Sequence, residues 1–478
     1  MYDILSNDAN CFIDNEEVLA SLSYGKAVAS DPTSIADILE KAKTYKGLSH
    51  RSAAALLEVT DKNTLEEIFS LAKQIKEQIY GRRIVLFAPL YLSDYCINSC
   101  TYCGYSKNNY NPIRRRLTID QLKEEVEILE KLGHKRLALE VGEDPINCPL
   151  DYVIDCINAI YSLKFDNGAI RRVNVNIAAT TKESYTRIKE ANIGTYILFQ
   201  ETYHKPTYLL NHPKGPKHNY EWHTEAHDRA MESGIEDVGF GVLYGLFDWK
   251  YDTIALLMHA EHLEASKGIG PHTISVPRLR SAEGMRQENF PHLVSDDHFK
   301  LLVAVLRIAV PYTGMILTTR ESPDFRNELL AVGISQVSAG SCTGVGGYAD
   351  SKKQSSGQKR LTSLSQFEPA DHRSPSEVIK SLLSGGYVPS FCTACYREGR
   401  TGDRFMDLAK TGNIADICQA NAVLTLKEYI EDFGDTELRE LGESIIQSEI
   451  YSMSNKNIQK ETINKISQTA KGTRDLRF

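Results

Sequence analysis

Eight short apolar runs, most of them separated by amphipathic helical stretches, constrain the fold of this 478-residue chain more than any other feature. The runs cover residues 84–90, 136–141, 172–178, 196–199, 237–243, 273–276, 314–318 and 334–338. Strands that alternate with helices are typical of a parallel sheet, because each crossover needs a long connection to return the chain. Eight such units favour an α/β fold of the closed (β/α)8 TIM-barrel type over an open doubly wound sheet.

Helical patterns flank these runs. Apolar side chains recur at three- and four-residue steps in residues 35–42 and 64–72, which predicts a helical N-terminal segment over residues 1–80. The barrel is expected over residues 81–345. One of its helices should begin after Thr118, where a glutamine three positions on completes the signature of a capping box.

The last third of the chain has a different composition. Residues 346–375 are rich in Ser, Lys, Gln and Gly, as surface loops and linkers are. Residues 422–430 return to a helical pattern. We therefore expect residues 346–478 to form a linker followed by a helical C-terminal extension.

Charge and hydropathy exclude several classes of partner. The net charge of -8 argues against a nucleic-acid or anionic membrane surface as the main partner. No apolar run approaches the roughly 18 residues needed to cross a bilayer. The N-terminus lacks the basic flank and apolar core of a signal peptide, so a cytoplasmic location is predicted. In that reducing compartment, ten cysteines are expected to be ligands, catalysts or buried thiols.

Cys96, Cys100 and Cys103 form a tight cluster directly after the first predicted strand. That position lies on the C-terminal rim of a barrel, where barrel enzymes keep their chemistry. Three thiolates can hold three irons of a cubane and leave the fourth iron open. A zinc knuckle or a chance grouping are the alternatives, but zinc would need a fourth ligand nearby, and the nearest histidine is His134.

A second set of cysteines lies in the C-terminal extension. Cys392, Cys395 and Cys418 have the spacing Cys-x2-Cys-x22-Cys. A Cys-x2-Cys pair suits zinc or a redox dithiol, whereas three thiolates and an open iron suit a second cubane. The spacing alone leaves iron–sulfur and zinc about equally favoured.

The first cluster resembles that of the radical S-adenosylmethionine (SAM) superfamily, whose hallmark is Cys-x3-Cys-x-aromatic-Cys with Tyr102 here at the aromatic position. The resemblance implies a 4Fe–4S cluster that binds SAM and splits it to start radical chemistry, with Tyr102 near the adenine. The superfamily also has a Gly-Gly-Glu segment after the second strand that contacts the amino group of SAM. Glu143 is the matching residue, although Val141 replaces the first glycine.

Across nearly its whole length the chain resembles the tyrosine lyases that mature [FeFe]-hydrogenase and, more distantly, the tyrosine lyases of thiazole synthesis. Shared landmarks are residues 199–204, 212–217 and 338–341. The hydrogenase group alone carries the C-terminal extension with the second cysteine triad, which is intact here and continues into the matching string 395–402.

That resemblance implies L-tyrosine as substrate, cleaved at Cα–Cβ to p-cresol and dehydroglycine, and then carbon monoxide and cyanide formed on iron at a second iron–sulfur cluster. Arg320 and Ser322 match the segment that binds the substrate carboxylate, the alternative being a surface Arg320 paired with Glu321. His272 matches a histidine that ligates an extra iron on the second cluster. Implied partners are a reductant such as a flavodoxin or ferredoxin and a hydrogenase assembly scaffold protein.

Three hypotheses of function follow. The first is the lyase that makes carbon monoxide and cyanide. The second is a tyrosine lyase that stops at dehydroglycine, and the intact triad at Cys392, Cys395 and Cys418 disfavours it. The third is an iron–sulfur scaffold without catalysis, which the SAM-type loop and the Arg320 segment disfavour. Glu201, Tyr203 and His204 follow the fourth predicted strand, so they are expected on the same rim.

Overall fold

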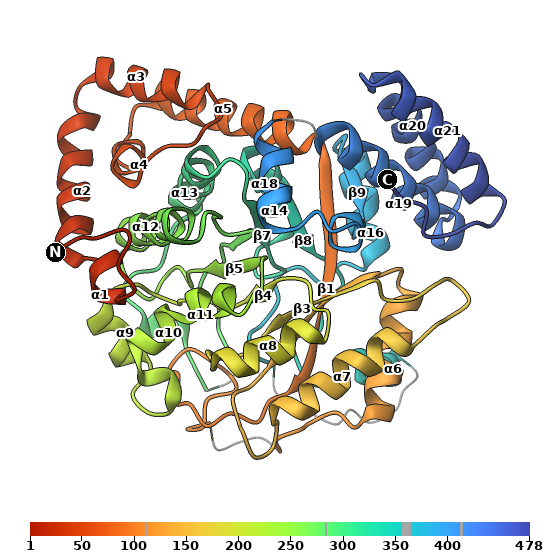
Figure 1. Ribbon diagram of the computed structural model, residues 1–478, viewed down its shortest axis with the longest axis horizontal. Helices are drawn as coiled ribbons and strands as arrows, with labels where there is room; N and C mark the ends of the chain where they lie inside the picture. Colours follow the sequence, from red (N-terminus) through yellow and green to blue (C-terminus); the bar gives the residue numbers. More distant parts are fainter. Residues whose placement is uncertain (110–112, 283, 356–364, 412–413) are drawn as a thin grey trace.

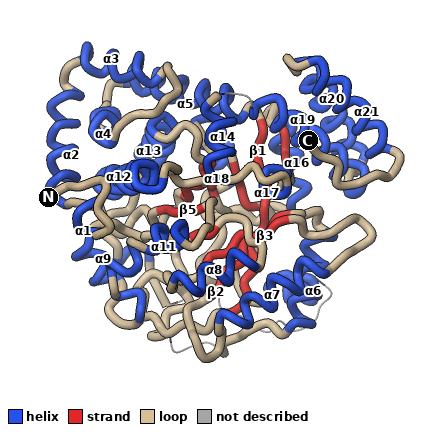
Figure 2. The backbone as a smooth tube through the Cα atoms, viewed as in Figure 1, coloured by secondary structure: helices blue, strands red, loops and turns tan. Residues whose placement is uncertain are grey.

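A closed parallel barrel forms the centre of the molecule (Figures 1 and 2). The computed structural model describes residues 1–478 except 110–112, 283, 356–364 and 412–413. The barrel strands are β1 (Arg83–Ser93), β2 (Arg136–Val141), β3 (Arg172–Asn176), β4 (Tyr196–Ile197), β5 (Val238–Gly241), β6 (Thr273–Ser275), β7 (Gly314–Leu317) and β8 (Gln336–Ser338). They follow one another around the barrel, and β1 closes it by pairing with both β8 and β2. The predicted (β/α)8 barrel is thereby confirmed.

A ninth strand, β9 (Val388–Ser390), extends the barrel at its N-terminal end. It pairs in parallel with Arg83–Val85, the first residues of β1. Strand β2 pairs with β1 only from Ala88 onward, nearer the C-terminal end of β1. The sequence analysis did not predict β9. This strand brings the chain after it, with the second set of cysteines, to the N-terminal mouth of the barrel.

The helices fall into three groups. The N-terminal helices are α1 (Ala9–Phe12), α2 (Asn15–Ala29), α3 (Pro32–Ala42), α4 (His50–Leu57) and α5 (Lys62–Tyr80). Around the barrel lie α6 (Ile119–Lys131), α7 (Leu150–Ser162), α8 (Lys182–Glu190), α9 (Lys205–Asn211), α10 (Tyr220–Thr224), α11 (Ala226–Glu232), α12 (Trp249–Lys267), α13 (Asp296–Ala309), α14 (Pro323–Val332) and α15 (Gly347–Ser355), with 3-10 turns at Pro216–His218 and Gln287–Asn289. The C-terminal helices are α16 (Pro375–Ser384), α17 (Ala394–Arg397), α18 (Gly402–Lys410), α19 (Ile414–Phe433), α20 (Thr436–Ser452) and α21 (Lys456–Ala470). Among the described helices, none is both long enough and apolar enough to span a membrane.

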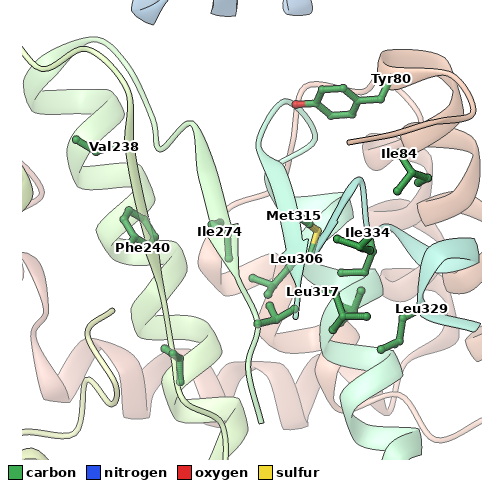
Figure 3. Packing of buried hydrophobic residues seen from close by; sticks show 14 of the residues in the cluster. Tyr80, Ile84, Val238, Phe240, Ile274, Leu306, Met315, Leu317, Leu329 and Ile334 are labelled. Carbon is green, nitrogen blue, oxygen red and sulfur yellow. The ribbon is translucent and has the colours of Figure 1, made fainter. Parts of the chain in front are cut away.

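Side chains of the strands alternate between two environments, as the period of two requires. On β1, Ile84, Leu86 and Leu90 face outward and are fully buried against the surrounding helices. Figure 3 shows the same kind of packing on the far side of the barrel, where Phe240 and Ile274 lie in the core between strands and helices. The alternate side chains point into the barrel, which leaves the barrel interior for function.

The segment after β8 differs from the predicted surface loop. Within 346–375 the chain begins with helix α15, and residues 356–364 lie outside the described part. The chain then returns over the barrel, where Asp371 and Ala370 donate backbone hydrogen bonds to the Thr319 carbonyl. A buried ion pair between Asp371 and Arg326 of α14 fixes this return.

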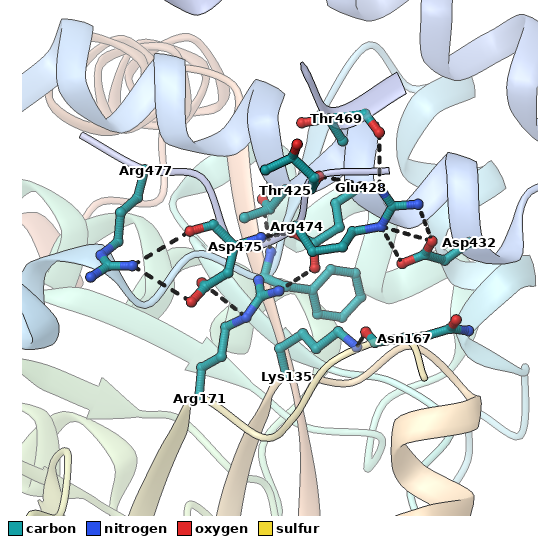
Figure 4. A network of polar contacts seen from close by, with 12 residues as sticks. Lys135, Asn167, Arg171, Thr425, Glu428, Asp432, Thr469, Arg474, Asp475 and Arg477 are labelled. Atoms are coloured by element: carbon teal, nitrogen blue, oxygen red, sulfur yellow. Dashed lines mark hydrogen bonds and ion pairs between the residues drawn. The ribbon is translucent and has the colours of Figure 1, made fainter. Parts of the chain in front are cut away.

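The C-terminal helices are fastened to the barrel by a network of charged side chains (Figure 4). Arg171, just before β3, pairs with Glu428 of α19 and lies 3.1 Å from Asp475 near the chain end. Asp475 in turn accepts an ion pair from Arg397, two residues after Cys395. The C-terminal tail therefore supports the second cysteine segment directly.

His50 at the start of α4 makes the N-terminal helices sensitive to pH. Its Nδ1 lies 2.6 Å from Glu261 and its Nε2 lies 3.0 Å from Glu17. Burial lowers the pKa of His50, but these two carboxylates outweigh it and the pKa is raised above 6.5. A raised folded-state pKa gives stability that is fully present below about pH 6.5 and is lost as pH rises through the folded pKa. We expect denaturant unfolding to show this loss in the wild type and a flatter profile in His50→Gln, and identical profiles would contradict the assignment.

Candidate active site

The two cysteine triads lie at opposite ends of the barrel. Cys96, Cys100 and Cys103 follow the C-terminal end of β1, whereas Cys392 and Cys395 follow β9, which pairs with the N-terminal end of β1. Strand β1 has 11 residues, so about 35 Å of extended chain separates the two ends at ~3.3 Å per residue.

Residues 212–217, one of the shared landmarks, form with Asn211 a cradle for the first cysteine loop. Backbone N–H groups of Ser99 and Thr101 donate to the carbonyls of Lys214 and Asn211. The Tyr102 hydroxyl lies 2.7 Å from His212 Nε2, and Tyr102 is buried. Gly215 has φ +104°, and a Cβ there would lie 2.3 Å from the Asn98 amide oxygen, so this close approach needs glycine.

The chain after β2 supports the loop from the other side. A Cβ on Gly142 would lie 2.3 Å from the Tyr95 carbonyl, so Gly142 lets the two backbones touch. Glu143 accepts a hydrogen bond of 2.6 Å from Asn98 Nδ2, and its backbone carbonyl accepts one from Ile97. Glu143 is half-buried and borders the cavity described next.

A cavity of about 180 Å³, the upper cavity, lies beneath the first cysteine loop. It is bordered by all three cysteines and by Tyr102, Glu140, Glu143, Asn176, Glu201, Lys217, Arg320, Ser338, Ser341, Gln366 and Phe367. Strands β1, β2, β3 and β8 contribute, together with the segments that follow the other barrel strands and the returning segment after α15. The upper cavity therefore combines a triad of thiols with several charged side chains.

Arg320 lines the upper cavity, and Ser322 does not. The Arg320 guanidinium stacks on the Phe367 ring, 3.5 Å from its centroid. The alternative pairing with Glu321 is wrong, because Glu321 binds Arg278 and Arg280 instead. The prediction for Ser322 is also wrong, since the chain turns outward there and Ser322 is the exposed N-cap of α14. The serines that border the cavity are Ser338 and Ser341, and the buried Ser341 hydroxyl has no hydrogen-bond partner within the described part of the chain.

Of the three residues expected after β4, only Glu201 reaches the upper cavity. It forms an ion pair of 2.6 Å with Lys217. Burial alone would lower the pKa of Lys217, but the charge of Glu201 outweighs it and the pKa is raised. Tyr203 is buried against His259 and His204 stacks on Phe247, so both serve packing.

The first triad suits a bound iron–sulfur cluster. Burial raises the pKa of Cys100, and burial with the charge of Cys96 raises the pKa of Cys103 to about 11. Thiolates crowded together in such a site need positive charge, which cluster iron supplies. The backbone N–H of Tyr105 also points at Cys103 Sγ, at 3.4 Å.

A second, smaller cavity, the lower cavity, lies at the N-terminal mouth of the barrel. It is bordered by Cys392, Cys395, His272, Tyr396, Arg83 and Arg136, among others. His272 Nε2 lies 3.1 Å from the Tyr396 hydroxyl, and its Nδ1 lies 3.4 Å from Asp237. The structure thus brings together the C-terminal cysteines and a histidine from a distant part of the chain.

Cys418, on α19, completes this group. Its thiol hydrogen-bonds to Cys395, which lowers the pKa of Cys395 to about 6 despite burial, and the charges of Arg83 and Arg400 act in the same direction. Cationic side chains beside three thiols suit an anionic iron–sulfur cluster. Among the described residues, no three His, Cys, Asp or Glu side chains are grouped tightly enough to hold a metal ion.

A cysteine loop of this spacing over the C-terminal mouth of a parallel barrel defines a radical SAM enzyme. Residues 90–260 match the profile of the Radical SAM superfamily, and residues 275–388 match that of the Biotin and Thiamin Synthesis associated domain. A 2-iminoacetate synthase from Salmonella typhimurium is 32% identical over 355 residues, which are 73% of this chain and 89% of the relative.

Solved structures agree with this class. The crystal structure of HydG, a maturase of the [FeFe]-hydrogenase, is 54% identical, with a TM-score of 0.93 over 98% of this chain and all of the other. HydG from Carboxydothermus hydrogenoformans is 37% identical, with a TM-score of 0.81 over 96% and 99% of the two chains. The chain belongs to the radical SAM superfamily, in the group of tyrosine lyases that includes the HydG maturases. The predicted family and enzyme class are confirmed.

Proposed function

We propose that this enzyme cleaves L-tyrosine at Cα–Cβ to p-cresol and dehydroglycine, and converts dehydroglycine to carbon monoxide and cyanide on iron for hydrogenase assembly. The observation that carries the proposal is Arg320, which has no ion-pair partner among the described residues and lines the cavity beneath the SAM-type cysteine loop. The likeness to HydG over almost the whole chain supports the same reaction. When bound at Cys96, Cys100 and Cys103, a 4Fe–4S cluster supplies the electron that splits SAM.

The residues of the upper cavity bind and shield the reactants. Arg320 presents a planar, permanently charged fork that suits a carboxylate, and stacking on Phe367 fixes its orientation. Ser341 offers a free hydroxyl beside it. Glu143 and Tyr102 border the side nearest the cysteines, where SAM would lie. Gln366 and Phe367 border the same cavity and would help to shield the reacting radical from water.

The lower cavity is proposed as the second iron–sulfur site, held by Cys392, Cys395 and Cys418, with His272 as ligand of an extra iron. When bound, that cluster supplies the iron chemistry that yields the two diatomic products. The half-buried Arg83 and the buried Arg136 would keep anionic species there. Residues 346–478 would accordingly act as the extension that carries this site.

Partners and location follow the same proposal. A flavodoxin or ferredoxin would supply electrons, and a hydrogenase assembly scaffold protein would accept the iron product. All ten cysteines are free thiols, which suits a reducing cytoplasm.

Removing the charge of Arg320 tests the substrate assignment. Truncating one partner of a buried, hydrogen-bonded charge pair costs about 2–5 kcal/mol, or roughly 30- to 5,000-fold in kcat/KM. We expect Arg320→Met to lose p-cresol formation to this extent while still producing deoxyadenosine from SAM and dithionite. Arg187→Met, a change on the exposed face of α8, is the matched control and should behave as the wild type. Unchanged kinetics in Arg320→Met would contradict the proposal.

A further inference from the structure

Two side chains of opposite charge border the upper cavity without pairing with each other. Glu140 on β2 accepts one hydrogen bond, 2.8 Å from Asn176 Nδ2 to its Oε2. Among the described residues, no cation lies within ion-pair distance of this carboxylate, and no other hydrogen bond reaches it. Its other oxygen is therefore open to the cavity.

Arg320 is the counterpart on the opposite wall, at the end of β7. Two strands, β8 and β1, lie between β7 and β2 around the barrel. Its guanidinium is held by the Phe367 ring alone, and within the described chain no hydrogen bond or ion pair uses its five N–H donors. A neutral neighbour thus fixes each of the two charges in place.

The other carboxylates of the cavity are already engaged. Glu201 has Lys217 at 2.6 Å. Glu143 has Asn98 at 2.6 Å and lies beside the cysteine loop. Glu140 is the acid of this cavity that has neither a cationic partner nor a place next to the first triad.

Enclosed charges without counter-charges are costly, and a ligand can remove that cost. Burial raises the pKa of Glu140 to about 8 and lowers the pKa of Arg320. A cation against Glu140 together with an anion against Arg320 would reverse both shifts. An α-amino acid carries both charges on groups bonded to a single carbon, so its zwitterionic head suits this pair of side chains.

We propose that Glu140 binds the α-ammonium group of the substrate whose α-carboxylate binds Arg320. This inference rests on the proposed lyase function and names the second half of its substrate recognition. It makes Glu140 a specificity residue, because a carboxylic acid without the amino group would leave Glu140 without a partner. With both head groups fixed, the phenol must be held by other residues.

Binding of three ligands to the full, anaerobically reconstituted chain with SAM tests the proposal. The ligands are L-tyrosine, 3-(4-hydroxyphenyl)propanoate, which lacks the amino group, and L-phenylalanine, which lacks the phenol hydroxyl. In the wild type, loss of the amino group should weaken binding roughly 10- to 100-fold, the range for a hydrogen bond to a charged group. In Glu140→Gln that ratio should fall to about threefold or less, whereas the tyrosine to phenylalanine ratio should stay as in the wild type.

The isosteric glutamine can still accept the Asn176 hydrogen bond, so the variant should fold, and unchanged iron content and far-UV circular dichroism would verify this. Glu140→Asp retains the charge and should keep most of the amino-group discrimination. The assignment would be overturned if Glu140→Gln discriminated against the ligand without the amino group as strongly as the wild type does. It would also be overturned if the variant lost its preference for tyrosine over phenylalanine instead. Failure of the wild type to bind tyrosine would instead overturn the proposed lyase function.

Discussion

Cys100→Ala should reduce the formation of deoxyadenosine from SAM and dithionite to background. Cys100 is the most buried member of the first triad, at 6% exposure, and packs among Leu243, Leu246 and Leu279 beneath the loop. A cubane held by two cysteines would lose the geometry that leaves one iron open for SAM. Deoxyadenosine and iron content measured on the same anaerobic sample should fall together, while the iron of the second site remains.

Cys156→Ala is the matched control for this loss. Cys156 on α7 is fully buried in the core and borders neither cavity. Its replacement should lower the free energy of unfolding slightly and leave deoxyadenosine formation intact. Wild-type cleavage of SAM by Cys100→Ala would remove the first triad from the active site.

The barrel could be predicted from the sequence because its signal is local. Each strand carries outward residues such as Ile84, Leu86 and Leu90 that repeat every second position, and each helix has its own apolar stripe. Strand β9 has three residues and contains Pro389, so it has no periodic signal. Its pairing with Arg83–Val85, more than 300 residues away in sequence, became visible only in three dimensions.

The candidate site was predictable to the extent that single motifs define it. Spacing identified both cysteine triads, and a motif drew attention to Arg320, which lines the upper cavity. Ser322 was misplaced because the chain turns outward into α14 only two residues after Arg320. Phe367 could not be predicted, since it enters the cavity from a segment whose polar composition is that of a surface loop.

Glu140 illustrates a different limit. It was assigned to a strand, but nothing in the sequence distinguishes an inward glutamate without a cationic partner from an ion-paired one. That difference depends on which cationic side chains surround Glu140 in the folded protein, and these come from distant parts of the sequence. Lys217 could have paired with any of the three cavity carboxylates, and the structure shows that it pairs with Glu201.

The double variant Cys392→Ala, Cys395→Ala should form p-cresol at the wild-type rate and make neither carbon monoxide nor cyanide. The two cysteines follow β9 at the N-terminal mouth, so the upper cavity and Arg320 should be undisturbed. Carbon monoxide trapped on deoxyhaemoglobin, together with p-cresol and deoxyadenosine from the same tube, would measure both halves of the reaction. Cys11→Ala, a half-buried thiol near the N-terminus, is the control.

This variant also separates the remaining hypotheses. The 2-iminoacetate synthase matches only 73% of the chain, whereas HydG matches 98%, so the two groups of relatives differ in how much of the chain they cover. Carbon monoxide in the wild type that disappears in the variant, with p-cresol retained, would assign the diatomic chemistry to the C-terminal triad. Equal carbon monoxide in both proteins would mean that the lower cavity serves another purpose. If the wild type yields p-cresol but no carbon monoxide, the enzyme stops at dehydroglycine. Without deoxyadenosine in any sample, only the scaffold hypothesis would remain.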